Sequence, residues 1–331
     1  MLSRVASNLY WLSRYLQRVE ITARLIRVHS NMLVDLPSAD PAVSWLPLVS
    51  ITGGSENIRD HGIASDSGSI CHFLISDERN PGSMIVSLQA IADNLRSSRS
   101  CMSTELYELI KELYSQSIEL VNLCRKKNLQ PVVLRSIEFQ SQAIAGAISN
   151  TIIRDASYLF LRAGSLIERS DMSSRILDVL AANLMSTGSG EKSIPYENTH
   201  WNAVLHTFSA HQMYMTHAAR PALGLDVLFF LLQNQNCPQS IHYCLKELAS
   251  CIQDIGSGHR GADQEAGSDV STRIPKLEEL IASLQSTDLV NQIGNRQQLH
   301  DFMTGLQKTL LQLDGDISER YFPANDVDGK L

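Results

Sequence analysis

The fold is decided by the stretch MLSRVASNLYWLSRYLQRVEITARLI, residues 1–26. Its apolar residues recur after three or four positions without a break, at Leu2, Val5, Leu9, Leu12, Leu16, Val19, Ala23 and Ile26. Because an α-helix turns once in about 3.6 residues, this spacing puts all of them along one side of a helix. Such a side packs against neighbouring helices. We therefore predict that residues 1 to about 31 form the first helix of a bundle.

The same spacing returns along most of the chain. It predicts helices that begin near Ile70 and that span about 81–99, 104–124, 131–184 (with a break near Asp155), 201–219, 221–233, 238–255, 275–286 and 296–320. Glycine and polar residues predict loops at 52–69, 186–199 and 256–273. The first of these loops lacks the spacing of a phosphate-binding loop, so we assign it no nucleotide role. Since no segment alternates as a strand does, the predicted fold is all-α.

The two halves of the chain carry matching residues in the same order. Arg18, Glu20, Thr22 and Arg24 match residues 151 positions later, which are Arg169, Asp171, Ser173 and Arg175. Further matches pair Trp45 with Trp201, Phe73 with Phe230, Pro81 with Pro238 and Leu106 with Leu277. Ordered matches of this kind indicate an internal duplication. We therefore predict a helical bundle of two diverged tandem copies of one helical unit (about 1–150 and about 151–322) around a shared core, with a tail at 323–331.

Each predicted copy places an acid four residues before an arginine, beside the apolar seam of its helix. These residues are Glu20 with Arg24, and Asp171 with Arg175. One interpretation is two salt bridges, solvated or half-buried, that tie helices together. The other is a polar site where the copies meet, in which arginines bind a carboxylate or phosphate. In the second case, the first helix packs beside the helix from about Asp155 to Leu184, and both sets share one groove.

Charge and hydropathy exclude several classes of protein. The net charge of −7 and the pI near 5.8 argue against binding to nucleic acid or to an anionic membrane surface. No apolar run approaches the length of about 18 residues needed to cross a bilayer. The first residues also lack the pattern of a signal peptide. We therefore expect a cytoplasmic protein.

The cysteines and histidines do not predict a metal site. Cys237, Cys244 and Cys251 recur every seven residues, which favours small buried residues on one helix face over a redox or metal role. His206, His211 and His217 lie five and six positions apart. This spacing misses the four-residue interval by which a helix presents two zinc ligands. We expect no metal and no cofactor.

Three segments resemble the alpha-E proteins, a bacterial family of all-helical proteins with a Glu-Arg motif. They are NLYWLSRYLQRVEITARL (8–25), FLISDERNPGS (73–83) and LRAGSLIERSDMSSRILDV (161–179). By position, the second-copy motif is intact as Glu168-Arg169 with Asp171 and Arg175. In the first copy Gln17 replaces the expected glutamate, while Arg14, Arg18, Glu20 and Arg24 remain. Glutamine keeps the hydrogen bonding of glutamate but not its charge, so a base or metal ligand would be lost there and a hydrogen bond kept.

The resemblance implies a part in making, modifying or degrading a peptide, alongside ATP-grasp peptide ligase-like or transglutaminase-like proteins. Our first hypothesis is a non-catalytic helical partner of such an enzyme, because the sequence shows no nucleophile triad, metal cluster or phosphate loop. The alternative is an enzyme of peptide or amide chemistry with Glu168 or Asp171 as acid or base. A third hypothesis is a small-anion-binding or regulatory role. The candidate binding residues are Arg14, Arg18, Glu20, Arg24, Arg169 and Arg175.

Overall fold

From Ser3 onward the opening stretch belongs to one long helix, α1 (Ser3–Asp35), in this computed structural model. Its apolar side is enclosed, since Leu9, Leu12, Val19 and Ile26 expose none of their surface. The predicted first helix is therefore confirmed, and its apolar seam is the side that packs.

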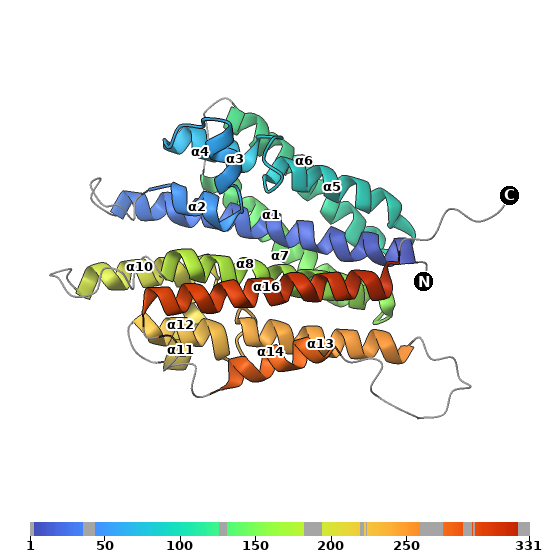
Figure 1. The fold of residues 1–331 in the computed structure, drawn as a ribbon. Helices are drawn as coiled ribbons and strands as arrows, with labels where there is room; N and C mark the ends of the chain where they lie inside the picture. The colour runs from blue at the N-terminus through green and yellow to red at the C-terminus, as the bar shows by residue number, and fades with distance from the viewer. Residues whose placement is uncertain are drawn as a thin grey trace.

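The structure describes residues 3–35, 44–125, 131–181, 194–218, 222, 224–258, 274–286, 293 and 295–323. Within these ranges every regular element is a helix, as Figure 1 shows. After α1 they are α2 (Leu46–Ile51), α3 (Ser55–Asp60), α4 (Ser67–Ile75), α5 (Met84–Ser97), η2 (Arg99–Cys101), α6 (Thr104–Arg125), α7 (Pro131–Thr151), α8 (Ala156–Ile176), η3 (Leu177–Ala181), α10 (Ile194–Thr207), α11 (His211–Ala218), α12 (Gly224–Gln233), α13 (Ile241–Gly258), α14 (Pro275–Gln285) and α16 (Arg296–Tyr321). The predicted all-α class is confirmed.

A side-chain cap starts α8 at the predicted break. The Asp155 carboxylate accepts hydrogen bonds from the backbone N–H groups of Ser157 and Tyr158, at 2.9 and 3.3 Å. An acidic residue in this position satisfies N–H groups that have no partner inside the helix. The cap therefore fixes the start of α8, the helix that carries Glu168.

Helices α1 and α8 lie together at the centre of the bundle, and a glycine lets them approach closely. A Cβ atom on Gly164 would come within 2.2 Å of the Tyr10 carbonyl oxygen and 2.3 Å of the Ser13 hydroxyl. A side chain at position 164 would therefore push the two helices apart. Close contact between α1 and α8 is what brings their polar residues within hydrogen-bond distance.

The other helices cover this central pair on two sides. Helices α5 and α7 pack on α1, α13 packs on α8, and α16 contacts both α1 and α8. Figure 1 shows α4 to α6 on one side of the pair and α11 to α14 on the other. The buried apolar residues of both halves form one continuous core, as predicted.

Similar caps open the helices that pack on α1 and α8. Ser83 accepts a hydrogen bond from the N–H of Val86 ahead of α5, and Ser240 accepts one from the N–H of Tyr243 ahead of α13. Each serine stands two residues after a proline that the sequence pairs, Pro81 or Pro238. The duplication itself stays a prediction.

Some boundaries differ from those expected. The segment 52–69, expected as a loop, contains α3 and the start of α4. The helix expected over 201–219 is two helices, α10 and α11, since Ser209 adopts a φ of 51° between them. The loops expected at 186–199 and 256–273 lie partly outside the described residues, and their described parts, 194–199 and 256–258, are helical and belong to α10 and α13. The tail at 323–331 lies outside the described residues apart from Pro323.

The structure also bears on the predictions about the cysteines and about membrane spans. Cys237, Cys244 and Cys251 are all buried. Among the described helices, none combines the length and the apolar character that a bilayer span requires.

Candidate functional site

Glu168 lies between the two central helices and is held by two arginines of α1. Its side chain is fully buried. Arg14 Nε donates to Oε2 at 2.9 Å, and Arg18 Nε donates to Oε1 at 2.6 Å. Burial alone would raise the pKa of this carboxyl, but the charges and hydrogen bonds of Arg18 and Arg14 outweigh it and lower the pKa. Glu168 is therefore a charged carboxylate that ties α8 to α1.

The same arginine also reaches α16. Arg14 Nη1 lies 2.6 Å from Asp314 Oδ1, which also accepts a hydrogen bond of 2.6 Å from the Tyr10 hydroxyl. The Arg14 guanidinium stands over the Trp11 ring, 4.5 Å from its centre. One buried guanidinium therefore joins three helices, and α16 supplies the carboxylate that balances it.

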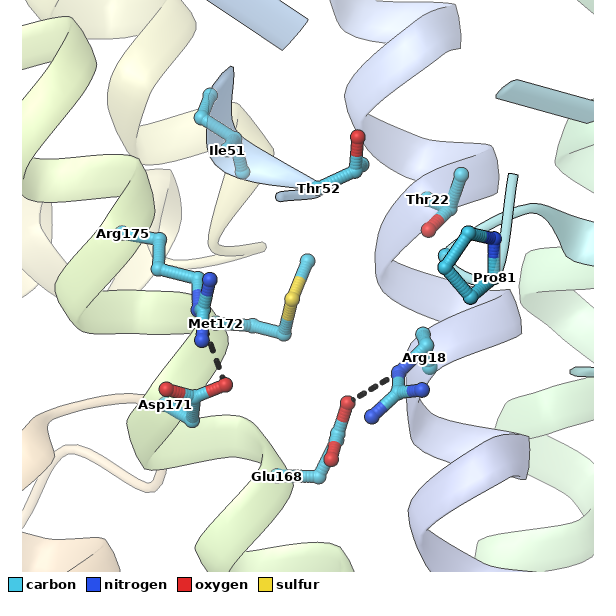
Figure 2. A pocket seen from close by; sticks show the side chains of 10 residues that line it. Arg18, Thr22, Ile51, Thr52, Pro81, Glu168, Asp171, Met172 and Arg175 are labelled. Carbon is cyan, nitrogen blue, oxygen red and sulfur yellow. Dashed lines mark hydrogen bonds and ion pairs between the residues drawn. The ribbon is translucent and has the colours of Figure 1, made fainter. Parts of the chain in front are cut away.

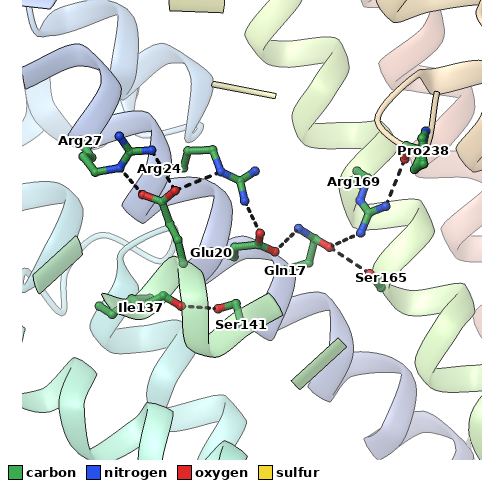
Figure 3. A network of polar contacts seen from close by, with 10 residues as sticks. Gln17, Glu20, Arg24, Arg27, Ile137, Ser141, Ser165, Arg169 and Pro238 are labelled. Carbon is green, nitrogen blue, oxygen red and sulfur yellow. Dashed lines mark hydrogen bonds and ion pairs between the residues drawn. The ribbon is translucent and has the colours of Figure 1, made fainter. Parts of the chain in front are cut away.

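Gln17 of α1 is in turn held by residues of α8, just as Glu168 of α8 is held by residues of α1. Figure 3 shows its Oε1 accepting hydrogen bonds from Ser165 Oγ at 2.9 Å and from Arg169 Nη2 at 3.0 Å. Arg169 also donates to the Pro238 carbonyl at 3.1 Å. Thus residues at positions 14 and 18 hold position 168, and residues at positions 165 and 169 hold position 17. These two sets of contacts correspond to each other, because positions 165, 168 and 169 each lie 151 residues after positions 14, 17 and 18.

Gln17 also donates a hydrogen bond that an ionised glutamate at this position could not donate. Its amide Nε2 donates to Glu20 Oε2 at 2.9 Å. A glutamate side chain has no such donor when it is ionised, and would bring two carboxylates together. The glutamine thus preserves the contact with α8 and also satisfies an acid on its own helix.

Glu20 and Arg24 do not share a groove with Asp171 and Arg175. Arg24 is buried and pairs with Glu20 on one side and with Glu138 of α7 on the other, at 3.4 Å. Arg27 donates to Glu138 as well, at 2.9 Å for Nη2. The common groove expected for both sets is therefore absent from the described structure, because α7 covers this flank of α1 and satisfies its arginines.

Asp171 and Arg175 instead line a cavity between α1 and α8, shown in Figure 2. Arg175 Nε donates to Asp171 Oδ2 at 3.0 Å. Burial raises the pKa of the Asp171 carboxyl, the Arg175 charge opposes this rise, and the Glu168 charge adds to it. The cavity, here called the α1–α8 pocket, has a volume of about 210 Å³ and is lined by Arg18, Thr22, Ile51, Thr52, Pro81, Gly82, Glu168, Asp171, Met172 and Arg175.

A second cavity lies against α16. It measures about 440 Å³ and is lined by Arg14, Arg18, Ile167, Asp171, Arg175, Thr304, Gln307, Lys308, Leu310, Leu311 and Asp314. Arg18, Asp171 and Arg175 line both cavities. These three residues, one from α1 and two from α8, are therefore accessible from two directions.

The structure divides the candidate residues into two groups. Those at the cavities are Arg14, Arg18, Glu168, Asp171 and Arg175. Arg169, Glu20 and Arg24 line neither cavity and make contacts within and between helices.

Sequence reasoning missed Asp314 and Glu138 as partners, since each lies on a distant helix and no local spacing marks it. Thr22 was noted only as part of the repeated pattern, yet it lines the α1–α8 pocket. Among the described residues, no cluster of His, Cys, Asp and Glu could hold a metal ion.

A family model and the similar proteins both match nearly the whole chain. A family model described as a predicted alpha-helical domain with a conserved ER motif matches residues 1–322. The chain is similar to an uncharacterized protein of Mycobacterium bovis and to one of Mycobacterium tuberculosis, each 23% identical over 345 residues. Each alignment covers 97% of this chain and 38% of the relative, so the chain spans less than two fifths of these relatives. No solved structure matches.

Proposed function

The chain belongs to the Alpha-E family, and from that premise we propose that it is a non-catalytic helical partner of a peptide-making or peptide-modifying enzyme. The enzyme class that we propose is an ATP-grasp peptide ligase-like or a transglutaminase-like protein. The chain would bind that enzyme and supply a site for part of its peptide.

The state of Glu168 is the observation that carries the non-catalytic role. Both of its oxygens accept hydrogen bonds from arginines, and its side chain is fully buried. A general base needs a pKa near the working pH and a position within reach of the substrate proton. The lowered pKa of Glu168 does not fit the first requirement, and both of its oxygens are already bonded to arginines although the residue lines the α1–α8 pocket. The Glu-Arg motif thus supports a structural role, in which it locks α8 to α1.

The lengths of the relatives support a role beside another protein. The matched stretch is 38% of those chains, so in them this unit is joined to a longer polypeptide. A helical unit that is joined to further polypeptide in its relatives is what we expect of a module that acts beside another domain or protein.

Complex formation tests the proposal. The purified chain is mixed at micromolar concentration with the ATP-grasp ligase-like or transglutaminase-like protein of the same genome, and the mass of the product is measured by light scattering after gel filtration. We expect a stable complex with one of them. An unrelated helical protein of similar size serves as the control. If neither enzyme binds at that concentration, the partner role is wrong.

A second candidate function rests on Asp171. This carboxyl lines both cavities, and burial raises its pKa toward the range that suits a general base. An enzyme of peptide or amide chemistry would use it with Arg175 as the group that binds the substrate anion. This candidate requires turnover of peptides or peptide amides by the isolated chain, and loss of that turnover in Asp171→Asn. An isolated chain with no turnover contradicts it.

A further inference from the structure

We propose that the α1–α8 pocket binds the α-carboxylate of an amino acid or of a peptide's last residue, a ligand class that rests on the proposed peptide function. Arg18 and Arg175 would hold the carboxylate, and Asp171 would accept the neighbouring N–H. The contacts of these three residues, together with one buried hydroxyl, support the proposal.

The two arginines present unused donors to the pocket. Arg18 bonds Glu168 through Nε, and Arg175 bonds Asp171 through Nε. Among the described residues, the terminal Nη groups of both side chains have no hydrogen-bond partner. Figure 2 shows the two guanidinium groups in the same cavity, on opposite helices. Planar guanidinium groups bind carboxylates through paired N–H donors.

The Thr22 hydroxyl points independently to a ligand. The side chain lines the pocket and is buried, with 1% of its surface exposed, and its Oγ1 has no hydrogen-bond partner among the described residues. Figure 2 shows this oxygen turned toward the pocket. A buried polar group without a partner costs about 1–3 kcal/mol. A ligand with a polar atom at this point removes that cost.

The balance of charge favours a carboxylate over a phosphate. Two arginines and two carboxylates, Glu168 and Asp171, line the pocket, so their charges cancel. A dianion would meet two carboxylates, and like charges at short range repel. A ligand with a carboxylate next to an ammonium group or an amide N–H would satisfy both kinds of group. Its carboxylate would accept from the arginines, and its N–H would donate to Asp171 Oδ1, which accepts no hydrogen bond from the described residues.

The volume of the pocket limits the size of the ligand. At about 210 Å³ it is smaller than the pockets of roughly 300–1,000 Å³ that enclose drug-sized molecules. The pocket therefore suits one amino-acid residue, with the rest of any peptide outside it.

Calorimetry on the isolated full chain tests the proposal. The probes are an alanine dipeptide, its C-terminal amide, its N-acetyl form and inorganic phosphate. We expect the dipeptide and its N-acetyl form to bind, the amide to bind at least about tenfold more weakly, and phosphate not to compete. Thr22→Val and Arg175→Lys should each lower the affinity for the dipeptide by about tenfold. Arg162→Ala, which removes an arginine of α8 that lines neither cavity and pairs with Glu247, should leave binding unchanged.

Several results would overturn the proposal. Equal binding of the dipeptide and its amide would show that the carboxylate is not recognised. Phosphate that binds tightly and is lost in Arg175→Lys would replace the ligand class by a phosphate group. No binding at millimolar concentration, with circular dichroism showing folded protein, would remove the site. Because no partner enzyme is present, these results stand apart from the test of complex formation.

Discussion

Replacing Glu168 with alanine should destabilise the protein by about 3 kcal/mol, near the lower end of the 3–5 kcal/mol expected when one partner of a buried ion pair is removed. The carboxylate is fully buried, and its arginines are 10% exposed at Arg14 and 23% exposed at Arg18. After the substitution Arg14 keeps Asp314 at 2.6 Å. Arg18 borders a cavity and gains water, so we do not expect the full cost.

Urea unfolding followed by circular dichroism measures this change. The matched control is Glu247→Ala, since Glu247 pairs with Arg162 of α8 at 2.5 Å but is 34% exposed. A pair as exposed as this contributes less than about 1 kcal/mol. A loss of less than 1 kcal/mol in Glu168→Ala, equal to that of the control, would refute the reasoning that Glu168 locks the two helices together.

The pH dependence gives a second measurement on the same variants. The pKa of Glu168 is lowered in the folded protein, so its stabilisation is present above the ordinary pKa of 4.5 and is lost as the pH falls through the folded value. The difference in stability between wild type and Glu168→Ala should therefore shrink in acid. A difference that stays constant down to low pH would contradict a charged Glu168.

Three further predictions follow from the same packing. Gln17→Glu should lose stability as the pH rises through about 5 to 7, because it sets two carboxylates together at Glu20; pH-dependent urea melts test this. Gly164→Ala should destabilise the protein by several kcal/mol in urea melts, because its methyl group would lie 2.2 Å from a carbonyl oxygen of α1. The control Gly305→Ala, which places a methyl group in open space on α16, should stabilise the protein by about 0.5–1 kcal/mol. Arg175→Ala should cost less than about 1 kcal/mol, since its side chain is 36% exposed; thermal melts that show a loss of 3 kcal/mol or more would mean a buried pair.

The apolar spacing of the sequence was enough to predict the fold class and the first helix. The spacing of three and four residues in α1 corresponds to a buried side. The break near Asp155 was also predictable, because an acidic residue at that place caps the next helix. The split between α10 and α11 was not, since it depends on the backbone conformation of Ser209.

The candidate site was predicted only in part. Spacing of four residues identified the pairs Glu20–Arg24 and Asp171–Arg175, because such pairs lie on one helix. It did not identify Glu138 or Asp314, which come from helices more than 100 positions away. It also gave no reason to place the two pairs in different surroundings. That difference arises when α7 packs on one flank of α1 and leaves the other flank open to cavities.

The contacts between α1 and the rest of the chain also have a consequence for synthesis. Glu168 follows Arg14 by 154 positions, and Asp314 follows Tyr10 by 304. The first helix thus leaves the ribosome long before α8 and α16 are made, whereas α5 and α7 follow it sooner. Contacts so distant along the chain close slowly, and the unpaired apolar side stays open to aggregation meanwhile. We therefore expect nascent α1 to depend on chaperones, and a chain stopped before residue 156 to remain unfolded.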